Sequence, residues 1–136
     1  MPALRARPER FGAIVALEAP HALISVDRWL ARRVGVVGGA LWDAPSRGLD
    51  VDPLTGPTEV HLAVTDRCSA GCRSCYADAT PAGHEPSTTE LLERLDAIAD
   101  QGAFYVAFGG GEALLRADLE ALAAHARDRG LIPTMT

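Results

Sequence analysis

The sequence contains no lysine: its 13 basic residues are all arginine, against 18 acidic residues, which gives a net charge of −5. The absence of lysine is a compositional bias of the source genome and carries no mechanism by itself. The absence of a basic excess has a consequence, because no positively charged stripe is left for a phosphate backbone. We therefore expect no nucleic-acid partner.

Long apolar runs are also absent. The most hydrophobic stretch, residues 34–42, is short and contains three glycines, whereas a membrane helix needs about 18 apolar residues. The amino terminus lacks the basic, apolar and small-residue order of an export signal. Together these absences predict a cytoplasmic protein that does not span a membrane.

Cysteine is scarce, and its distribution is informative. The three cysteines lie within eight residues of one another, so they cannot form a framework of paired disulfides and instead resemble a cluster of metal ligands. The remaining composition is that of a folded protein, since 48% of the 136 residues are hydrophobic. That share excludes a disordered tail and is sufficient for one packed domain of ordinary size.

Residues 1–57 read as a small α+β leader segment with a connector. Two strands are predicted at 12–17 and 22–26, followed by a short helix over 27–33 that begins behind an Asp27 cap. The stretch 38–57 is rich in proline and glycine and is interpreted as the connector. Trp29 and Trp42 are predicted to be packing residues.

Residues 58–136 show a regular alternation of strands and helices. Strands are predicted at 59–64, at 103–108 and from Leu131 onward. A capping box at residues 87–90 begins a helix that ends at Gly102, and a second helix is predicted over 117–129. The cysteines fall in a long loop, residues 65–86, and a glycine run follows the second strand.

This order predicts an α/β fold with a parallel sheet and crossover helices. The carboxyl ends of parallel strands share one edge, so the cysteine loop and the glycine run should be neighbours. A closed barrel takes about 250 residues, and the 79 residues from 58 to 136 cannot supply one. We therefore expect a partial (β/α) barrel, its first three strands and two helices, in a truncated chain whose third strand is an unpaired edge.

The cysteines follow the spacing Cys68-x-x-x-Cys72-x-x-Cys75. Three thiolates are one short of the four that saturate a cubane iron–sulfur cluster or a structural zinc ion. One metal position would then stay open, as a catalytic centre requires. Gly71 supplies backbone freedom for wrapping the loop around a metal.

The glycine run ends in Gly110, Gly111 and Glu112. Glycines let the backbone approach a ligand closely, and the Glu112 carboxylate offers an acceptor to a cation. The alternative for Glu112 is an ordinary acidic residue at a helix start, favoured by the helix dipole. A glycine run after a strand can also be a phosphate cradle or a plain turn.

The three-cysteine loop together with Gly110-Gly111-Glu112 resembles the radical S-adenosylmethionine (radical SAM) superfamily, from about residue 60 to the end of the chain. The resemblance implies that Cys68, Cys72 and Cys75 bind a four-iron four-sulfur (4Fe-4S) cluster whose fourth iron is chelated by S-adenosyl-L-methionine. It further implies reductive cleavage to a 5′-deoxyadenosyl radical that abstracts a substrate hydrogen. The Gly-Gly-Glu stretch would receive the methionine ammonium, and a ferredoxin or flavodoxin would supply the electron.

Two positions depart from the family pattern. Ser74 stands where an aromatic residue often precedes the last cysteine, and Ala113 stands where a proline often follows the glutamate. The first departure affects the expected adenine contacts, which Tyr76 could supply from the next position. The alternative for Tyr76 is packing beneath the loop.

The leader and the run Cys75-Tyr76-Ala77 are similar to SPASM-type family members, which modify ribosomally made peptides. A peptide is therefore the expected substrate, with a cofactor-biosynthesis or RNA-modifying activity as the alternative within the family. From a different class, the alternative is a non-catalytic zinc or iron–sulfur binding module, its fourth ligand supplied by His84, His61 or water.

Overall fold

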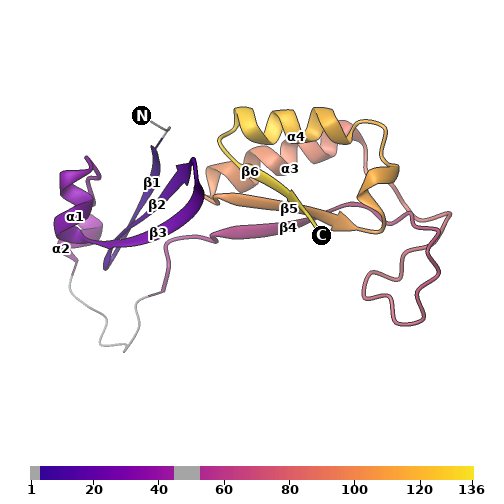
Figure 1. The fold of residues 1–136 in the computed structure, drawn as a ribbon, viewed down its shortest axis with the longest axis horizontal. Coiled ribbons are helices and arrows are strands. Elements are labelled where there is room, and N and C mark those ends of the chain that lie inside the picture. Colours follow the sequence, from indigo (N-terminus) through magenta and orange to yellow (C-terminus); the bar gives the residue numbers. More distant parts are fainter. Residues whose placement is uncertain (1–3, 45–52) are drawn as a thin grey trace. The chain divides into compact units, whose positions relative to one another are not determined.

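A computed structural model of the protein describes residues 4–44 and 53–136 (Figure 1). The chain divides into two compact units, Met1–Gly56 and Pro57–Thr136. In the described part of the chain, no helix combines the length and the hydropathy needed to cross a membrane.

The first unit is an antiparallel sheet with two short helices. Its strands β1 (Leu4–Glu9), β2 (Gly12–Glu18) and β3 (His21–Asp27) pair in the order β1-β2-β3. The two predicted strands are confirmed as β2 and β3, whereas β1 was not predicted, because Pro8 and three charged side chains obscure the strand pattern. Pro8 is tolerated there because β1 is an edge strand.

The helices of the first unit are α1 (Arg28–Arg33) and α2 (Ala40–Asp43). The predicted cap is confirmed, since the Asp27 carboxylate accepts a hydrogen bond of 2.8 Å from the Leu30 amide. The single-turn helix α2 lies inside the stretch interpreted as a connector, and residues 45–52 of that stretch lie outside the described residues.

The two tryptophans of the first unit differ in burial. Trp42 is 8% exposed, and its indole N–H donates to the carbonyl oxygens of Glu9 (2.8 Å) and Gly12 (3.1 Å), as expected of a packing residue. The same expectation is wrong for Trp29, which is 65% exposed. The Arg33 guanidinium lies over its ring at 5.0 Å, a cation–π contact that is available at the surface of the protein.

The second unit is a parallel sheet with helices on one face. Strands β4 (Glu59–Thr65), β5 (Tyr105–Gly110) and β6 (Ile132–Met135) pair in the order β4-β5-β6. Helices α3 (Thr88–Asp100) and α4 (Leu119–Asp128) lie side by side along the sheet (Figure 1). The predicted α/β alternation is confirmed, and the described sheets are two sheets of three strands each.

The core of this unit lies between the sheet and the two helices. The alternating strand residues Leu62, Val64, Val106 and Phe108 pack there against the apolar faces of both helices. The buried helix residues are Leu91, Leu95 and Ile98 on α3 and Leu122 and Ala126 on α4. Both reciprocal bonds of the predicted capping box are present, between Ser87 and Glu90.

The glycine run corrects the prediction for β5. The strand was expected over 103–108 with glycines following it, but it spans Tyr105–Gly110, so that Gly109 pairs with Ala63 and Gly110 with Thr65. Glycine lowers strand propensity, which explains the expected early end. A short 3₁₀ helix, η1 (Ala113–Leu115), also precedes α4, which begins two residues later than predicted.

Candidate functional site

The cysteine loop, predicted at residues 65–86, spans residues 66–87 between β4 and α3 in the structure, and its two ends, the base of the loop, are joined by backbone hydrogen bonds. The amides of Asp66 and Cys68 donate to the carbonyl oxygens of His84 (2.8 Å) and Thr80 (2.9 Å), and Thr80 donates back to Asp66 (3.1 Å). Arg67 and Thr80 form an isolated parallel bridge. These bonds bring the two ends of the loop together immediately after the end of β4.

The residues that follow β5 lie against this base. The Gly111 amide donates to the Thr65 carbonyl (2.7 Å), and the Glu112 amide donates to the Arg67 carbonyl (2.9 Å). The expected proximity of the cysteine loop and the glycine run is confirmed by these two bonds.

Two glycines make this approach possible. A Cβ on Gly110 would overlap the Thr65 carbonyl oxygen, and a Cβ on Gly111 would overlap the Arg67 carbonyl oxygen. Gly110 also has φ +104°, a conformation that side chains rarely adopt. In the structure these two positions therefore require glycine because their backbone lies directly against the backbone of Thr65 and Arg67.

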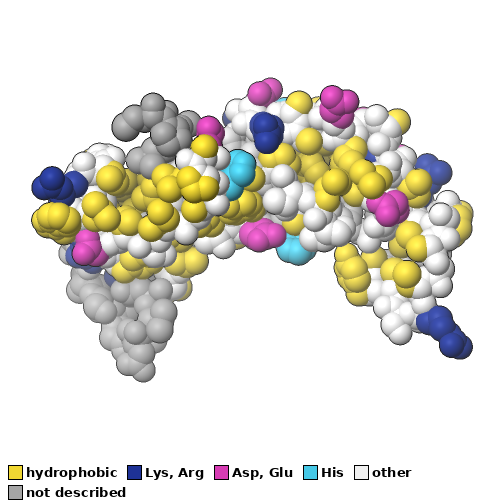
Figure 2. All heavy atoms as spheres, in the orientation of Figure 1, with side chains coloured by type: hydrophobic (Ala, Val, Ile, Leu, Met, Phe, Trp, Pro, Cys, Tyr) yellow, Lys and Arg dark blue, Asp and Glu magenta, His cyan; other side chains and the backbone are white. Residues whose placement is uncertain are grey.

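The tip of the cysteine loop, residues 69–79, is held by fewer hydrogen bonds than the base. Cys72 and Cys75 lie in the tip, and Cys68 lies directly before it. All three cysteines are free, with Cys72 exposed and Cys68 and Cys75 partly buried. The Cys68 sulfur accepts a long hydrogen bond of 3.4 Å from the Ala70 amide. Figure 2 shows this projecting loop covered mostly by neutral side chains, with a basic one at its end.

The chemistry of this donor set fits an iron–sulfur cluster, since soft thiolates from one short loop are its usual ligands. Gly71 has φ +65°, a conformation that side chains rarely adopt, and no atom lies within 4 Å of where its Cβ would be. Among residues 4–44 and 53–136, no three His, Cys, Asp or Glu side chains converge into a group that could hold a metal ion.

Glu112 is exposed, and its carboxylate Oε1 accepts a 3.1 Å hydrogen bond from the Leu114 amide, capping η1. The alternative role at a helix start thus has a direct contact in the structure. A carboxylate has about four acceptor positions, so this cap leaves capacity for a second partner.

Tyr76 lines a cavity of about 280 Å³ at the carboxyl ends of β4 and β5. The side chain is 85% exposed, which excludes the alternative that it packs beneath the loop. Strand residues and the glycine run form much of the wall. The Tyr76 side chain and the glycine backbone, which a ligand could approach closely, therefore line the same cavity. The other lining residues are His61, Leu62, Ala63, Asp66, Ala77, Gly109, Gly110 and Thr136.

Arg116 is a residue of this region that the sequence did not single out. It is 6% exposed, and its Nη1 donates to the carbonyl oxygens of Val64 and Pro86, both at 2.8 Å. Its Nε and Nη2 donate to the two carboxylate oxygens of Asp118, at 2.8 and 2.6 Å. No sequence pattern indicates this role, because two of the acceptors are backbone carbonyls 52 and 30 residues away.

Asp118 completes the arrangement by also accepting a 2.6 Å hydrogen bond from the Thr88 hydroxyl. The hydrogen bond from Arg116, assisted by that from Thr88, lowers the pKa of Asp118 from its ordinary value near 3.8 to about 2. The first residue of α3 and the residue before α4 are thus joined through one ionised carboxylate.

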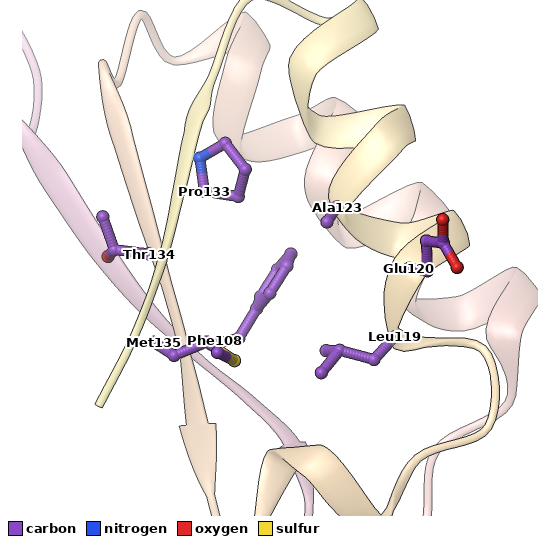
Figure 3. A pocket seen from close by; sticks show the side chains of 7 residues that line it. All are labelled: Phe108, Leu119, Glu120, Ala123, Pro133, Thr134 and Met135. Carbon is purple, nitrogen blue, oxygen red and sulfur yellow. The ribbon is translucent and has the colours of Figure 1, made fainter. Parts of the chain in front are cut away.

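A second cavity, of about 330 Å³, lies between α4 and β6 and is apolar (Figure 3). The Phe108 ring points into the space between the strand and the helix, toward Leu119 and Ala123 (Figure 3). Neither the cysteines nor the glycine run line it. In the described sheet β6 pairs only with β5 and is an edge strand, as expected.

Comparison with known proteins gives a family match that lies within the second unit. The family model described as the Radical SAM superfamily matches residues 62–135. Fe-coproporphyrin III synthase of Methanosarcina barkeri is 40% identical over 70 residues, which cover 50% of this chain and 18% of that protein. PqqA peptide cyclase of Xanthomonas euvesicatoria is 39% identical over 77 residues, covering 55% of this chain and 21% of that protein. The matched regions thus amount to about a fifth of the relatives' length.

The fold is similar to that of a solved structure over nearly the whole chain. Streptococcus suis SuiB bound to S-adenosylmethionine gives a TM-score of 0.63 at 18% identity, covering 97% of this chain and 40% of that one. SuiB bound to its precursor peptide SuiA gives a TM-score of 0.62 at 17% identity, covering 99% and 42%. The coverage is larger than the second unit alone can account for, so the likeness of fold extends into the first unit.

Proposed function

The chain belongs to the radical SAM superfamily, and from that premise we propose that residues 58–136 are the amino-terminal part of a radical SAM barrel, preceded by a leader and connector at 1–57. Membership implies an enzyme. The proposed ligands of a 4Fe-4S cluster are Cys68, Cys72 and Cys75. Gly110, Gly111, Glu112 and Tyr76 are the proposed contacts of S-adenosyl-L-methionine.

One observation carries the proposal. The amides of Gly111 and Glu112 donate to the carbonyl oxygens of Thr65 and Arg67, where the cysteine loop begins. The segments that carry the proposed metal ligands and the proposed cofactor contacts therefore meet at the carboxyl edge of the parallel sheet. Two different loops that meet in this way can serve a single cofactor pair.

Each proposed residue has a distinct task. The three thiolates would hold a cluster with one iron left open for the amino and carboxylate groups of the cofactor. The Glu112 carboxylate would accept a hydrogen bond from the cofactor ammonium, and the exposed Tyr76 ring would offer an apolar face to the adenine. The bound cluster and S-adenosyl-L-methionine would supply reductive cleavage to a 5′-deoxyadenosyl radical for hydrogen abstraction.

The proposed substrate is a ribosomally made peptide. PqqA peptide cyclase, by its name, acts on a peptide, and the SuiB structure holds a precursor peptide. The likeness of fold to SuiB includes the first unit, whereas the similarity to Fe-coproporphyrin III synthase spans 70 residues. The proposed electron donor is a ferredoxin or flavodoxin, and the proposed location is the cytoplasm.

The test is anaerobic reconstitution with iron and sulfide. We expect about four irons per chain and a brown, oxygen-sensitive protein. A Cys72→Ala variant should lose the cluster, and a Ser74→Ala variant, changed two residues away at the same exposed tip, should retain it. A colourless protein that binds one zinc ion would instead support the zinc-binding alternative.

A second candidate function is a step in iron porphyrin synthesis, because a relative that is 40% identical over 70 residues is named Fe-coproporphyrin III synthase, after the compound it makes. Titration of the reconstituted protein with iron coproporphyrin separates the two candidates. A saturable shift of the Soret band at micromolar concentration supports the porphyrin, and an unshifted band favours the peptide.

A further inference from the structure

We infer that Arg116 is a positioning residue, which sets the place of the cysteine loop relative to the Gly110-Gly111-Glu112 segment. That this placement serves cluster and cofactor binding rests on the proposed function, whereas the effect of Arg116 on the position of the loop does not. The inference starts from its acceptors, which lie on three different parts of the second unit.

The guanidinium binds both ends of the cysteine loop at once. The Val64 carbonyl lies at the end of β4, two residues before the loop begins, and the Pro86 carbonyl lies two residues before α3. The same nitrogen, Nη1, donates to both at 2.8 Å. The separation of the two ends of the loop is therefore fixed by the two donor directions of one planar group.

The other side of the guanidinium fixes where Arg116 itself lies. Its Nε and Nη2 bind the two oxygens of Asp118 in a fork, and Asp118 accepts from Thr88 on α3. Arg116 follows Glu112 by four residues, across the single turn of η1. The segment that carries Glu112 is thereby held at both its ends, by the Glu112 amide on Arg67 and by the Arg116 side chain.

Burial indicates why an arginine is needed here. The Arg116 side chain is 3% exposed, and Nε, Nη1 and Nη2 all donate to oxygen. A buried cation without partners would be strongly destabilising. A lysine keeps the charge, but its compact ammonium cannot reproduce a fork onto one carboxylate and a pair of bonds to two carbonyls.

The test compares Arg116→Lys with Arg129→Lys in the full 136-residue chain. Arg129 is the control, because it is also an ion-paired arginine beside α4, binding Asp96 and Asp100 at 2.9 and 2.7 Å, but at the opposite end of α4 from the loop. Far-UV circular dichroism first establishes that both variants keep the helices of the second unit.

Hydrogen exchange in the metal-free chain is the first measurement. Arg116→Lys should raise exchange at the loop-base amides about tenfold or more, a change in local opening of about 1.4 kcal/mol, and leave the β5 amides protected. The control should leave the loop base unchanged. The loop-base amides are those of Asp66, Cys68, Thr80, Gly83, Gly111 and Glu112.

The second measurement is the electron paramagnetic resonance spectrum of the reduced, reconstituted protein. Addition of S-adenosyl-L-methionine should shift the signal in wild type and Arg129→Lys, and the shift should be reduced or lost in Arg116→Lys at equal iron content. A purely structural loss of stability would not move this signal while the helices remain folded.

The outcomes separate the two proposals. If exchange at the loop base is unchanged in Arg116→Lys, or rises equally in β5, the inference is overturned. If wild type forms no cluster at all, the proposed function fails, while the exchange experiment still decides whether Arg116 holds the loop.

Discussion

The base and the tip of the cysteine loop differ in what holds them. The base, residues 66–68 and 80–87, is bound by backbone hydrogen bonds on both sides and by the buried Arg116. The tip carries Cys72 at an exposed position and has a glycine with open space around it. The fold thus holds the start and the end of the loop more firmly than its tip.

The proposed function gives this difference a physical reason. If the loop binds the proposed cluster, thiols packed against their own chain would block access of the metal. A loop that is unrestrained at both ends, however, would lose more conformational entropy when it closes around the metal. A fixed base lowers this loss of conformational entropy, and an open tip keeps the thiols accessible to the metal.

Glycine substitutions give the largest expected contrast in stability. Gly111→Ala places a Cβ onto the Arg67 carbonyl oxygen at the base, so we expect a loss of about 2–3 kcal/mol in the free energy of unfolding. Gly71→Ala at the tip meets open space and pays only for its φ of +65°, about 1 kcal/mol. Both tryptophans belong to the first unit, so urea unfolding is best followed by the helical circular dichroism signal. Equal losses in the two variants would show that the tip is packed as tightly as the base.

Much of the second unit could be predicted from local signals. The capping box at Ser87 and Glu90 and the apolar spacing of Leu91, Leu95 and Ile98 determine α3 without reference to the rest of the chain. The parallel sheet followed from the order of the elements, and with it the proximity of the cysteine loop to the glycine run. These features depend on residues close together in sequence, or on general topology.

The features that could not be predicted depend on contacts between distant residues. Arg116 acts on Val64 and Pro86, and neither carbonyl leaves a trace in a side-chain pattern. Gly109 and Gly110 were expected to end the strand, but pairing with Ala63 and Thr65 extends it. Strand pairing overrides local propensity there, and at Gly110 the neighbouring backbone requires glycine, because a Cβ would overlap the Thr65 carbonyl oxygen.

Glu112 offers a test in the segment that lies against the base. Glu112→Gln keeps the Oε1 acceptor for the Leu114 amide but removes the charge, and a charge-assisted hydrogen bond contributes about 1.5–3 kcal/mol. We expect S-adenosyl-L-methionine to bind about tenfold to a hundredfold more weakly, at unchanged iron content, in equilibrium dialysis. Glu90→Gln is the control, since Glu90 is also exposed and also caps a helix. Unchanged affinity in Glu112→Gln would leave this residue with its capping role alone.

The smallest expected effect is the pH dependence of the stability that Asp118 contributes beside the base of the cysteine loop. Hydrogen bonds from Arg116 and Thr88 hold the pKa of Asp118 at about 2, below its ordinary value near 3.8. Because the carboxylate is favoured in the folded state, its contribution is complete above about pH 4 and is lost as the pH falls toward 2. Asp118→Asn should therefore be less stable than wild type at pH 6, by about 1 kcal/mol because the carboxylate is partly exposed, and the difference should shrink at pH 2.5. Urea unfolding at both values measures it, with Asp100→Asn as the surface control. A difference that stays constant between the two pH values would mean that the Asp118 charge does not stabilise the base, and that Arg116 holds the loop through its bonds to Val64 and Pro86 alone.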